Sequence, residues 1–196
     1  AELGTGGAMG ARTGERRVQR ERASGRSRPV GIKNRPDGNV QVAVDAILTA
    51  RNPHLFPSLT KEGAPALFHT RGNAHGHLVL RGGTETGPNY SVEHVANAVS
   101  LLNAAGLPAA IMVDLSHGNS KKDPQRQYDV AHALAEQLAD GEEAIRGVMI
   151  ESHLVSGRQD IGDLTKLTYG QSITDACLNL DETVRVLELL AGSIRS

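Results

Sequence analysis

Charged and metal-binding side chains stand at the ends of four short apolar segments in this 196-residue sequence. The segments close with Lys33, with Arg81, with the pair Asp114 and His117, and with Glu151. Unpaired cations are costly at the ends of buried segments, so Lys33 and Arg81 call for an anion. Phosphate and carboxylate oxygens suit a guanidinium fork. A salt bridge to a nearby carboxylate such as Asp114 is an equally good interpretation of either cation.

A mixed set of nitrogen and oxygen donors lies in the second half of the sequence. His117 follows one apolar segment, Glu151 ends the next, and Asp175 precedes the last helical stretch. One imidazole and two carboxylates suit divalent Mn, Fe, Co or Zn. Spacing alone also fits a hydrogen-bonded structural histidine, and His75 and His77 form a competing pair that ranks lower because it precedes a strand.

Strand-like and helix-like stretches alternate along the chain and must position these residues. Apolar runs predict strands at 3–10, 30–33, 78–80, 111–115 and 148–150. Periodicity, capping residues and prolines predict helices at 15–23, 39–51, 91–105, 123–140 and from 181 onward. Residues 67–69 predict a short hairpin or excursion with its turn at 71–73. Short uninterrupted apolar strands are typical of a parallel sheet covered on both faces.

This layout predicts an α/β fold of the (β/α)8 TIM-barrel family, whose active sites are built from the carboxyl ends of the strands. A doubly wound open sheet is the alternative, although no G-x-G-x-x-G motif follows a strand. A complete barrel takes about 250 residues. We therefore expect residues 1–196 to form a single partial barrel domain holding about the last five β/α units, with the first three strands absent.

Composition limits the partners. The net charge of -1 gives no electrostatic reason to expect nucleic acid or an anionic membrane, and no apolar run approaches the roughly 18 residues of a membrane span. The basic residues at 16–28 are interpreted as a solvated helix face, and a ligand-facing or partner-facing role is the alternative. The single cysteine, Cys177, excludes an intrachain disulfide and fits a reducing compartment, so we expect a cytoplasmic protein. The first residue is not Met, which suggests processing or a fragment.

A series of motifs, in one order along the chain, resembles type I DAHP (3-deoxy-7-phosphoheptulonate) synthases from end to end. The motifs occupy residues 10–13, 31–34, 37–39, 80–83, 88–90, 114–120, 147–153 and 169–177. The resemblance implies condensation of phosphoenolpyruvate with erythrose 4-phosphate, the first step of the shikimate pathway, on a barrel with a divalent metal ion. It also implies a homo-oligomer in the full-length form.

The resemblance assigns roles to individual residues. His117, Glu151 and Asp175 would be metal ligands, and Lys33 and His117 would be catalytic. The implied substrate-binding residues are Gly10, Ala11, Arg12, Lys33, Arg81 and Asp175. A feedback pocket for an amino acid would include Ser27, Phe56 and Ser58, although Arg26 and Phe68 depart from the usual pattern of that pocket.

Two family features are missing from the sequence: a cysteine metal ligand on the first barrel strand and a Lys-Pro-Arg-Thr motif on the second. Cys177 matches a different family position and is interpreted as a buried thiol. We therefore expect this chain alone to be inactive. The alternative is a non-catalytic barrel remnant that binds a phosphorylated ligand or acts as a regulatory partner of a full-length enzyme.

Overall fold

The computed structural model describes residues 6–10 and 16–194, and its centre is a five-stranded parallel sheet. The strands are β1 (Gly7–Met9), β2 (Val30–Lys33), β5 (Gly76–Leu80), β6 (Ile111–Asp114) and β7 (Ile145–Met149). Each strand pairs with the next in chain order, β1-β2-β5-β6-β7. A doubly wound sheet would reverse its order part-way. The unreversed order is that of a barrel wall, so the predicted α/β fold with about five units is confirmed.

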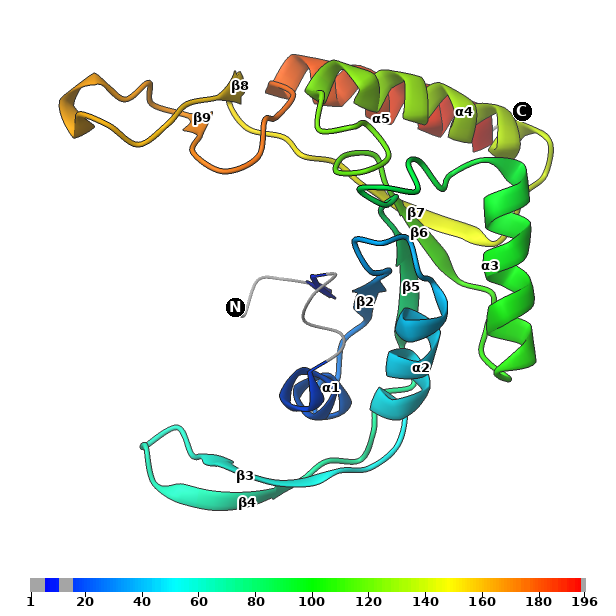
Figure 1. The fold of residues 1–196 in the computed structure, drawn as a ribbon, viewed down its shortest axis with the longest axis vertical. Coiled ribbons are helices and arrows are strands. Elements are labelled where there is room, and N and C mark those ends of the chain that lie inside the picture. The colour runs from blue at the N-terminus through cyan, green and yellow to red at the C-terminus, as the bar shows by residue number, and fades with distance from the viewer. Residues whose placement is uncertain (1–5, 11–15, 195–196) are drawn as a thin grey trace.

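The helices lie along one side of the sheet and leave its other side open (Figure 1). They are α1 (Arg17–Ser24), α2 (Gln41–Ala50), α3 (Val92–Ala104), α4 (Gln127–Ala139) and α5 (Leu180–Ile194). Val44, Val95 and Leu134 from the helices are fully buried in one cluster with Leu78 and Val113 from the strands. Burying each such side chain stabilises the fold by about 1.5–3 kcal/mol. The core therefore holds the strand ends, and with them the candidate site, in place.

Two helix starts follow the predicted capping residues. The Ser91 side chain accepts from the backbone N–H of His94 at the start of α3. Asp123 accepts from the backbone N–H of Gln125. The second element differs from the prediction in its first turn, because Pro124–Arg126 form a 3-10 turn, η1, before α4 begins.

An antiparallel hairpin extends away from the sheet (Figure 1). It pairs β3 (Leu55–Leu59) with β4 (Pro65–His69), and its turn closes through the Thr60 N–H and the Ala64 carbonyl at 2.9 Å. The excursion was predicted, but the predicted turn position at 71–73 is wrong. Gly72 lies at the base of the hairpin, where a Cβ atom would come within 2.1 Å of the Arg51 carbonyl oxygen. Glycine at position 72 therefore allows a close backbone contact and does not form the hairpin turn.

A second excursion separates β7 from α5. It contains β8 (Val155–Arg158), the 3-10 turn η2 (Leu164–Lys166) and β9 (Gln171–Ser172), with β8 and β9 paired in parallel. This region has no hydrophobic periodicity, and no strand was predicted in it. The strand β7 also begins and ends earlier than the predicted 148–150, so Glu151 lies beyond its last residue. No helix in the described part of the chain is long and apolar enough to cross a membrane.

Candidate metal and anion site

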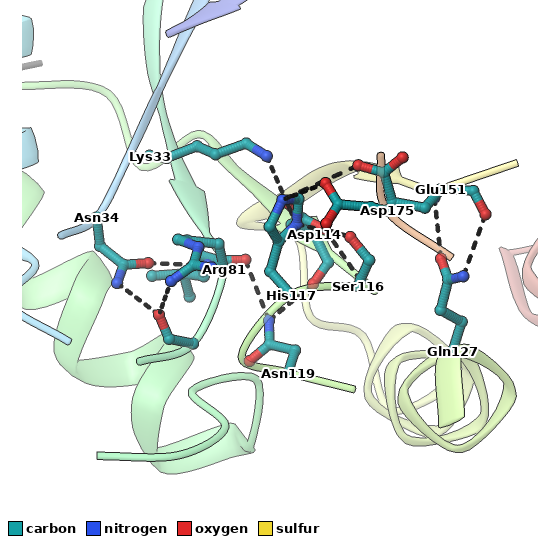
Figure 2. Close-up of polar contacts among 12 residues, drawn as sticks. Lys33, Asn34, Arg81, Asp114, Ser116, His117, Asn119, Gln127, Glu151 and Asp175 are labelled. Carbon is teal, nitrogen blue, oxygen red and sulfur yellow. Dashed lines mark hydrogen bonds and ion pairs between the residues drawn. The ribbon is translucent and has the colours of Figure 1, made fainter. Parts of the chain in front are cut away.

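The predicted strand-end residues meet at the carboxyl edge of the sheet (Figure 2). Lys33 ends β2 and Asp114 ends β6, and their side chains form an ion pair with Nζ 2.6 Å from Oδ2. His117 lies in the loop after β6, with Nδ1 2.9 Å from the same carboxylate oxygen. One buried carboxylate therefore orients both residues that were predicted to be catalytic.

Asp114 is fully buried, and its second oxygen is also occupied. Ser116 donates to Oδ1 from its backbone N–H at 2.9 Å and from its hydroxyl at 2.6 Å. Burial by itself raises the pKa of Asp114. The hydrogen bond from His117 and the charge of Lys33 more than offset this effect, and the pKa lies well below its usual range. Asp114 is thus ionised, and both of its carboxylate oxygens already accept hydrogen bonds from neighbouring side chains or backbone.

His117 connects this anchor to two further carboxylates. Its backbone φ is 53°, in a region that residues other than glycine rarely occupy. With Nδ1 held by Asp114, Nε2 lies 3.9 Å from Oε1 of Glu151 and 3.9 Å from Oδ2 of Asp175. One donor atom from each of His117, Glu151 and Asp175 lies within 4.8 Å of the others. These three residues form a group that could hold a metal ion, and the two carboxylates give it the charge that a divalent cation requires.

Glu151 is fixed through its backbone. Gln127, fully buried at the start of α4, donates from Nε2 to the Glu151 carbonyl at 3.1 Å. Gln127 also accepts from the Glu151 N–H at 3.0 Å. Burial raises the pKa of the Glu151 carboxyl, and the nearby charges of Asp175 and Asp114 raise it further. A cation would relieve this repulsion, which supports the fit of the group to a metal.

Arg81 lies beside this group, and the charges of Asp114 and Asp175 partly offset the cost of its burial. Its side chain is buried, and in the described part of the chain its guanidinium makes one long hydrogen bond, to the Gly82 carbonyl at 3.4 Å, and no ion pair. Burial lowers the pKa of Arg81, but a guanidinium stays protonated in proteins. Arg81 lines a pocket of about 530 Å³ together with His117, Lys121 and Lys122. Glu85 also lines the pocket, but the described lining carries more positive than negative side chains, which favours an anion as its occupant.

Lys33 and Arg81 therefore differ in whether a carboxylate of the protein already binds them. Lys33 forms the predicted salt bridge with Asp114. Arg81 has no ion pair in the described residues, so the prediction that it binds an anion stays a prediction. The backbone beside this pocket is closely packed, since a Cβ on Gly82 would come within 2.5 Å of the carbonyl carbon of Gly118, which lines the pocket. The loop after β5 thus packs directly on the loop that carries His117.

Three buried asparagines join these loops, and sequence reasoning missed all of them. Asn34 accepts from the Arg81 N–H at 2.8 Å, and Asn89 accepts from the Gly82 N–H at 2.7 Å. Asn119 accepts from the Asn89 N–H at 2.8 Å. Each asparagine lies within one of the motifs at 31–34, 88–90 and 114–120, but no role was predicted for it, because its partners are set only by the fold.

The other predicted residues lie elsewhere. Ala11 and Arg12 fall outside the described residues, and Gly10 follows directly after β1. Ser27, Phe56 and Ser58 share a separate pocket of about 510 Å³ between the end of α1 and the hairpin.

Three residues that were ranked low as metal ligands, Cys177, His75 and His77, lie outside the metal group. Cys177 is buried, and burial raises the pKa of its thiol, which fits the buried-thiol interpretation. His75 and His77 line a pocket with residues that precede or begin the neighbouring strands, such as Pro108 and Arg146. This position is the opposite end of the sheet from Glu151.

Comparison with known proteins identifies the family. The model of the DAHP synthetase I family matches residues 1–188. The chain belongs to this family. The phospho-2-dehydro-3-deoxyheptonate aldolase of Escherichia coli K12 named Phe-sensitive is 50% identical over 196 residues, which cover 100% of this chain and 55% of that protein. A putative phospho-2-dehydro-3-deoxyheptonate aldolase of Schizosaccharomyces pombe is 48% identical over 198 residues, covering 100% of this chain and 54% of that protein.

A solved structure agrees with the fold. The phospho-2-dehydro-3-deoxyheptonate aldolase of Francisella tularensis SCHU S4 superposes with a TM-score of 0.94 at 50% identity, covering 99% of this chain and 56% of that one. The resemblance inferred from the motifs is therefore confirmed. This DAHP synthase-family chain spans about half the length of the curated relatives it matches.

Proposed function

We propose that the protein carrying this chain condenses phosphoenolpyruvate with erythrose 4-phosphate to give 3-deoxy-D-arabino-heptulosonate 7-phosphate and phosphate. The observation that carries the proposal is the position of Arg81. A buried guanidinium without an ion pair in the described residues lines the same pocket as His117, the central member of the possible metal group. A phosphorylated carboxylate and a divalent metal ion would satisfy these two features together.

In this proposal the substrate phosphoenolpyruvate is held by cations and backbone at the strand ends. Arg81 and Lys33 bind its phosphate and carboxylate oxygens, together with Arg12 and the backbone of Gly10 and Ala11. Guanidinium and ammonium groups bind such oxygens through charge-assisted hydrogen bonds. Their positive charge also offsets the substrate's negative charge while C2 becomes electron-poor.

The metal ligands would be His117, Glu151 and Asp175, and the ion would be Mn, Fe, Co or Zn. A divalent ion there would supply Lewis-acid polarisation of the aldehyde of erythrose 4-phosphate. Asp114 keeps the His117 ring oriented with Nε2 toward the two carboxylates. Asp175 would also contact the substrate.

The chemical steps follow from this placement. The C3 methylene carbon of phosphoenolpyruvate attacks the aldehyde carbon and forms the new carbon–carbon bond. Water adds at C2 and the C2–oxygen bond to phosphate breaks, so that C2 becomes a ketone. Of the two protons that the water loses, one goes to the former aldehyde oxygen and one leaves with the phosphate. Lys33, whose ammonium donates to Asp114 at 2.6 Å, would serve as the proton-handling group beside His117.

The direct test separates binding from turnover. We expect the 196-residue chain to bind phosphoenolpyruvate in calorimetry, with affinity falling roughly 10–100-fold in Arg81→Gln as charge-assisted hydrogen bonds are lost. We expect no phosphate release by this chain alone when both substrates and metal are added. Absence of phosphoenolpyruvate binding would contradict the proposed function. Turnover by the chain alone would contradict its expected inactivity.

The alternative, a non-catalytic remnant or regulatory partner, predicts a different result. The remaining part of the barrel can be supplied from the E. coli relative. Phosphate release by the combined protein supports the enzyme, whereas binding without turnover in that combination supports the remnant.

We also propose that the second pocket, with Ser27, Phe56 and Ser58, is a regulatory ligand site. Its support is the pocket itself and the names of the relatives, since one E. coli protein is named Phe-sensitive and another Trp-sensitive.

A further inference from the structure

Gln127 connects the start of α4 to both carboxylates of the possible metal group. We propose that Gln127 is a positioning residue, whose side-chain amide fixes the Glu151 peptide and thereby sets the spacing of the Glu151 and Asp175 carboxylates. The inference rests on the proposed function, because it concerns the metal ion of that function. It adds a residue that contacts neither the ion nor the substrate and controls how tightly the ion is held.

The two carboxylates of the group have little to hold them in place directly. Within the described residues, the Glu151 and Asp175 carboxylates accept no hydrogen bond, and each has one oxygen 3.9 Å from Nε2 of His117. Their side chains are 31% and 55% exposed. His117 differs, because Asp114 contacts its ring directly at 2.9 Å. The positions of the two carboxylates therefore depend on the backbone that carries them.

The Glu151 peptide lies just beyond the end of β7, where β6 no longer supplies partners. The last contact of that ladder is from the Leu115 N–H to the Met149 carbonyl at 2.8 Å. Gln127 replaces the neighbouring strand two residues later. Its Nε2 donates to the Glu151 carbonyl at 3.1 Å, and its Oε1 accepts from the Glu151 N–H at 3.0 Å (Figure 2). A glutamine amide can do both because it has a carbonyl oxygen and an NH₂ group.

The same peptide also holds the segment that carries Asp175. The Glu151 carbonyl accepts a second hydrogen bond, from the Leu178 N–H at 3.0 Å. Leu178 lies three residues after Asp175 and is fully buried, and its carbonyl accepts from the His153 N–H at 2.9 Å. One carbonyl oxygen thus receives both Gln127 from α4 and the segment that ends the excursion. A displacement of the Glu151 peptide would therefore move both carboxylates.

The start of α4 is well placed to fix this peptide. Gln127 is fully buried. The hydroxyl of the adjacent Tyr128 donates to the Glu182 carbonyl at 3.1 Å, which joins α4 to α5. Gln125, in the turn before α4, donates to the Glu182 carboxylate at 3.0 Å. Because side chains in a close-packed interior occupy single rotamers, Gln127 holds the Glu151 peptide in one position.

A purely structural role for Gln127 is the alternative, since any buried N–H and carbonyl need partners. Gln137 has such a role on the same helix. It is buried, and its Nε2 donates to the Tyr90 carbonyl at 2.9 Å and to the Ala133 carbonyl at 3.2 Å. Neither partner belongs to the metal group. The two glutamines therefore separate an effect on the metal ligands from an effect on the stability of the fold.

Gln127→Met and Gln137→Met form a matched pair of variants. Methionine keeps the length of the side chain and removes its hydrogen bonds. Both variants should melt at a lower temperature than the unsubstituted chain. Only Gln127→Met should lose Mn²⁺ affinity, by roughly 10–100-fold in calorimetry well below the melting temperature. Gln137→Met should stay within about twofold of the unsubstituted chain, because distant sites without shared partners act independently.

A spectrum measures the arrangement of the ligands separately from the affinity. The visible absorption bands of bound Co²⁺ depend on the positions of its ligands. At saturating Co²⁺ we expect these bands to shift in Gln127→Met and to stay the same in Gln137→Met. If Gln127→Met does not fold, Gln127→Asn replaces it. Asparagine keeps an amide that is one methylene shorter, and it should produce the same two changes.

Loss of Mn²⁺ affinity confined to the Gln127 variant, together with a shifted Co²⁺ spectrum, supports the proposal. Unchanged Mn²⁺ affinity or an unchanged Co²⁺ spectrum in a folded Gln127 variant would each overturn it. Equal losses of affinity in Gln127→Met and Gln137→Met would overturn it too. The absence of Mn²⁺ and Co²⁺ binding by the unsubstituted chain would do the same. Phosphoenolpyruvate binding remains a separate test of the proposed function in every case.

Discussion

Oδ2 of Asp114 lies 2.9 Å from Nδ1 of His117, and this contact leaves Nε2 facing Glu151 and Asp175. The same oxygen receives the Lys33 ammonium at 2.6 Å. A buried carboxylate thus selects which ring nitrogen is available to a metal and keeps a lysine next to it. Loss of a group that orients a metal-binding histidine in this way typically costs about 10–100-fold in metal affinity.

Asp114→Asn should therefore weaken metal binding without removing any ligand. The amide keeps the size of the side chain but brings an N–H group against Lys33 or His117 in place of a charge. We expect affinity for Mn²⁺ or Zn²⁺ to fall by about 10–100-fold. Because the variant breaks a buried charge pair, unfolding free energy should also fall by about 3–5 kcal/mol. Calorimetry and urea denaturation measure both effects. Asp129→Asn, an exposed change on α4, should alter neither, and an unchanged Asp114→Asn protein would rule out the positioning role.

Metal should stabilise the chain through His117, Glu151 and Asp175. Ligands that bind only the folded state add about 2.7 kcal/mol at a free concentration 100 times the Kd. We expect Mn²⁺ or Zn²⁺ to raise the melting temperature, and a chelator to reverse the rise. Glu151→Gln should abolish most of the shift, because an amide is a weaker ligand than a carboxylate. Glu143→Gln, at an exposed site, is the control. A full shift in Glu151→Gln would show that the ion binds elsewhere.

Sequence patterns found the part of the site that follows from strand geometry. Lys33, Arg81, His117 and Glu151 were predicted to converge because parallel strands bring their carboxyl ends to one edge. Asp175 was first grouped with them as an oxygen donor of suitable type. The position of Asp175 depends on the path of the segment between β7 and α5. That segment has no hydrophobic periodicity, so its path could not be predicted from the sequence.

The supporting amides were missed for a related reason. Gln127 reaches Glu151 across 24 residues, and Asn89 reaches Asn34 across 55. Such pairs leave no periodic signal, and amides are common on solvated surfaces. Only the folded chain shows that these side chains satisfy buried backbone groups.

Asn89→Ala should loosen the loops around Arg81. The variant leaves the Gly82 N–H without its 2.7 Å acceptor in a buried place. An unsatisfied buried group costs about 1–3 kcal/mol, which denaturant unfolding will detect. Amide exchange at Gly82 should also quicken. Asn97→Ala, on the exposed side of α3, should be neutral or slightly stabilising, because alanine favours helices. Equal stabilities for the two variants would contradict a clamping role for Asn89.

Glu182 should make stability depend on pH at the start of α5. Its carboxylate accepts from the Asn179 N–H at 2.8 Å, from the Ser156 hydroxyl at 2.7 Å and from Gln125 at 3.0 Å. The Asn179 bond, followed by the other two, lowers the pKa of Glu182 below its ordinary value of 4.5. The folded state then binds fewer protons than the unfolded state. The stabilisation is complete above about pH 4.5–5 and is lost as pH falls through the lowered pKa.

Glu182→Gln keeps a side chain that can still accept from Asn179 but removes the charge. Its unfolding free energy should depend less on pH between about 5 and 3 than that of the unsubstituted chain. Urea unfolding at several pH values measures the slope. Glu188→Gln, on the exposed face of the same helix, should leave the slope as it was. Parallel pH profiles for all three proteins would exclude the proposed contribution of Glu182.

The hairpin should drive association of the isolated chain. Register places Leu55, Leu59 and Leu67 on the face opposite the stacked phenylalanines, and these leucines are 61%, 63% and 72% exposed. A two-stranded hairpin is marginally stable in water, and exposed apolar strands invite pairing with another chain. The sheet edges at β1 and β7 add to this tendency within the described residues. We expect concentration-dependent association in sedimentation. Leu59→Gln with Leu67→Gln should reduce it, whereas Leu187→Gln on α5 should not. A chain that stays monomeric at every concentration would remove the hairpin as a contact surface.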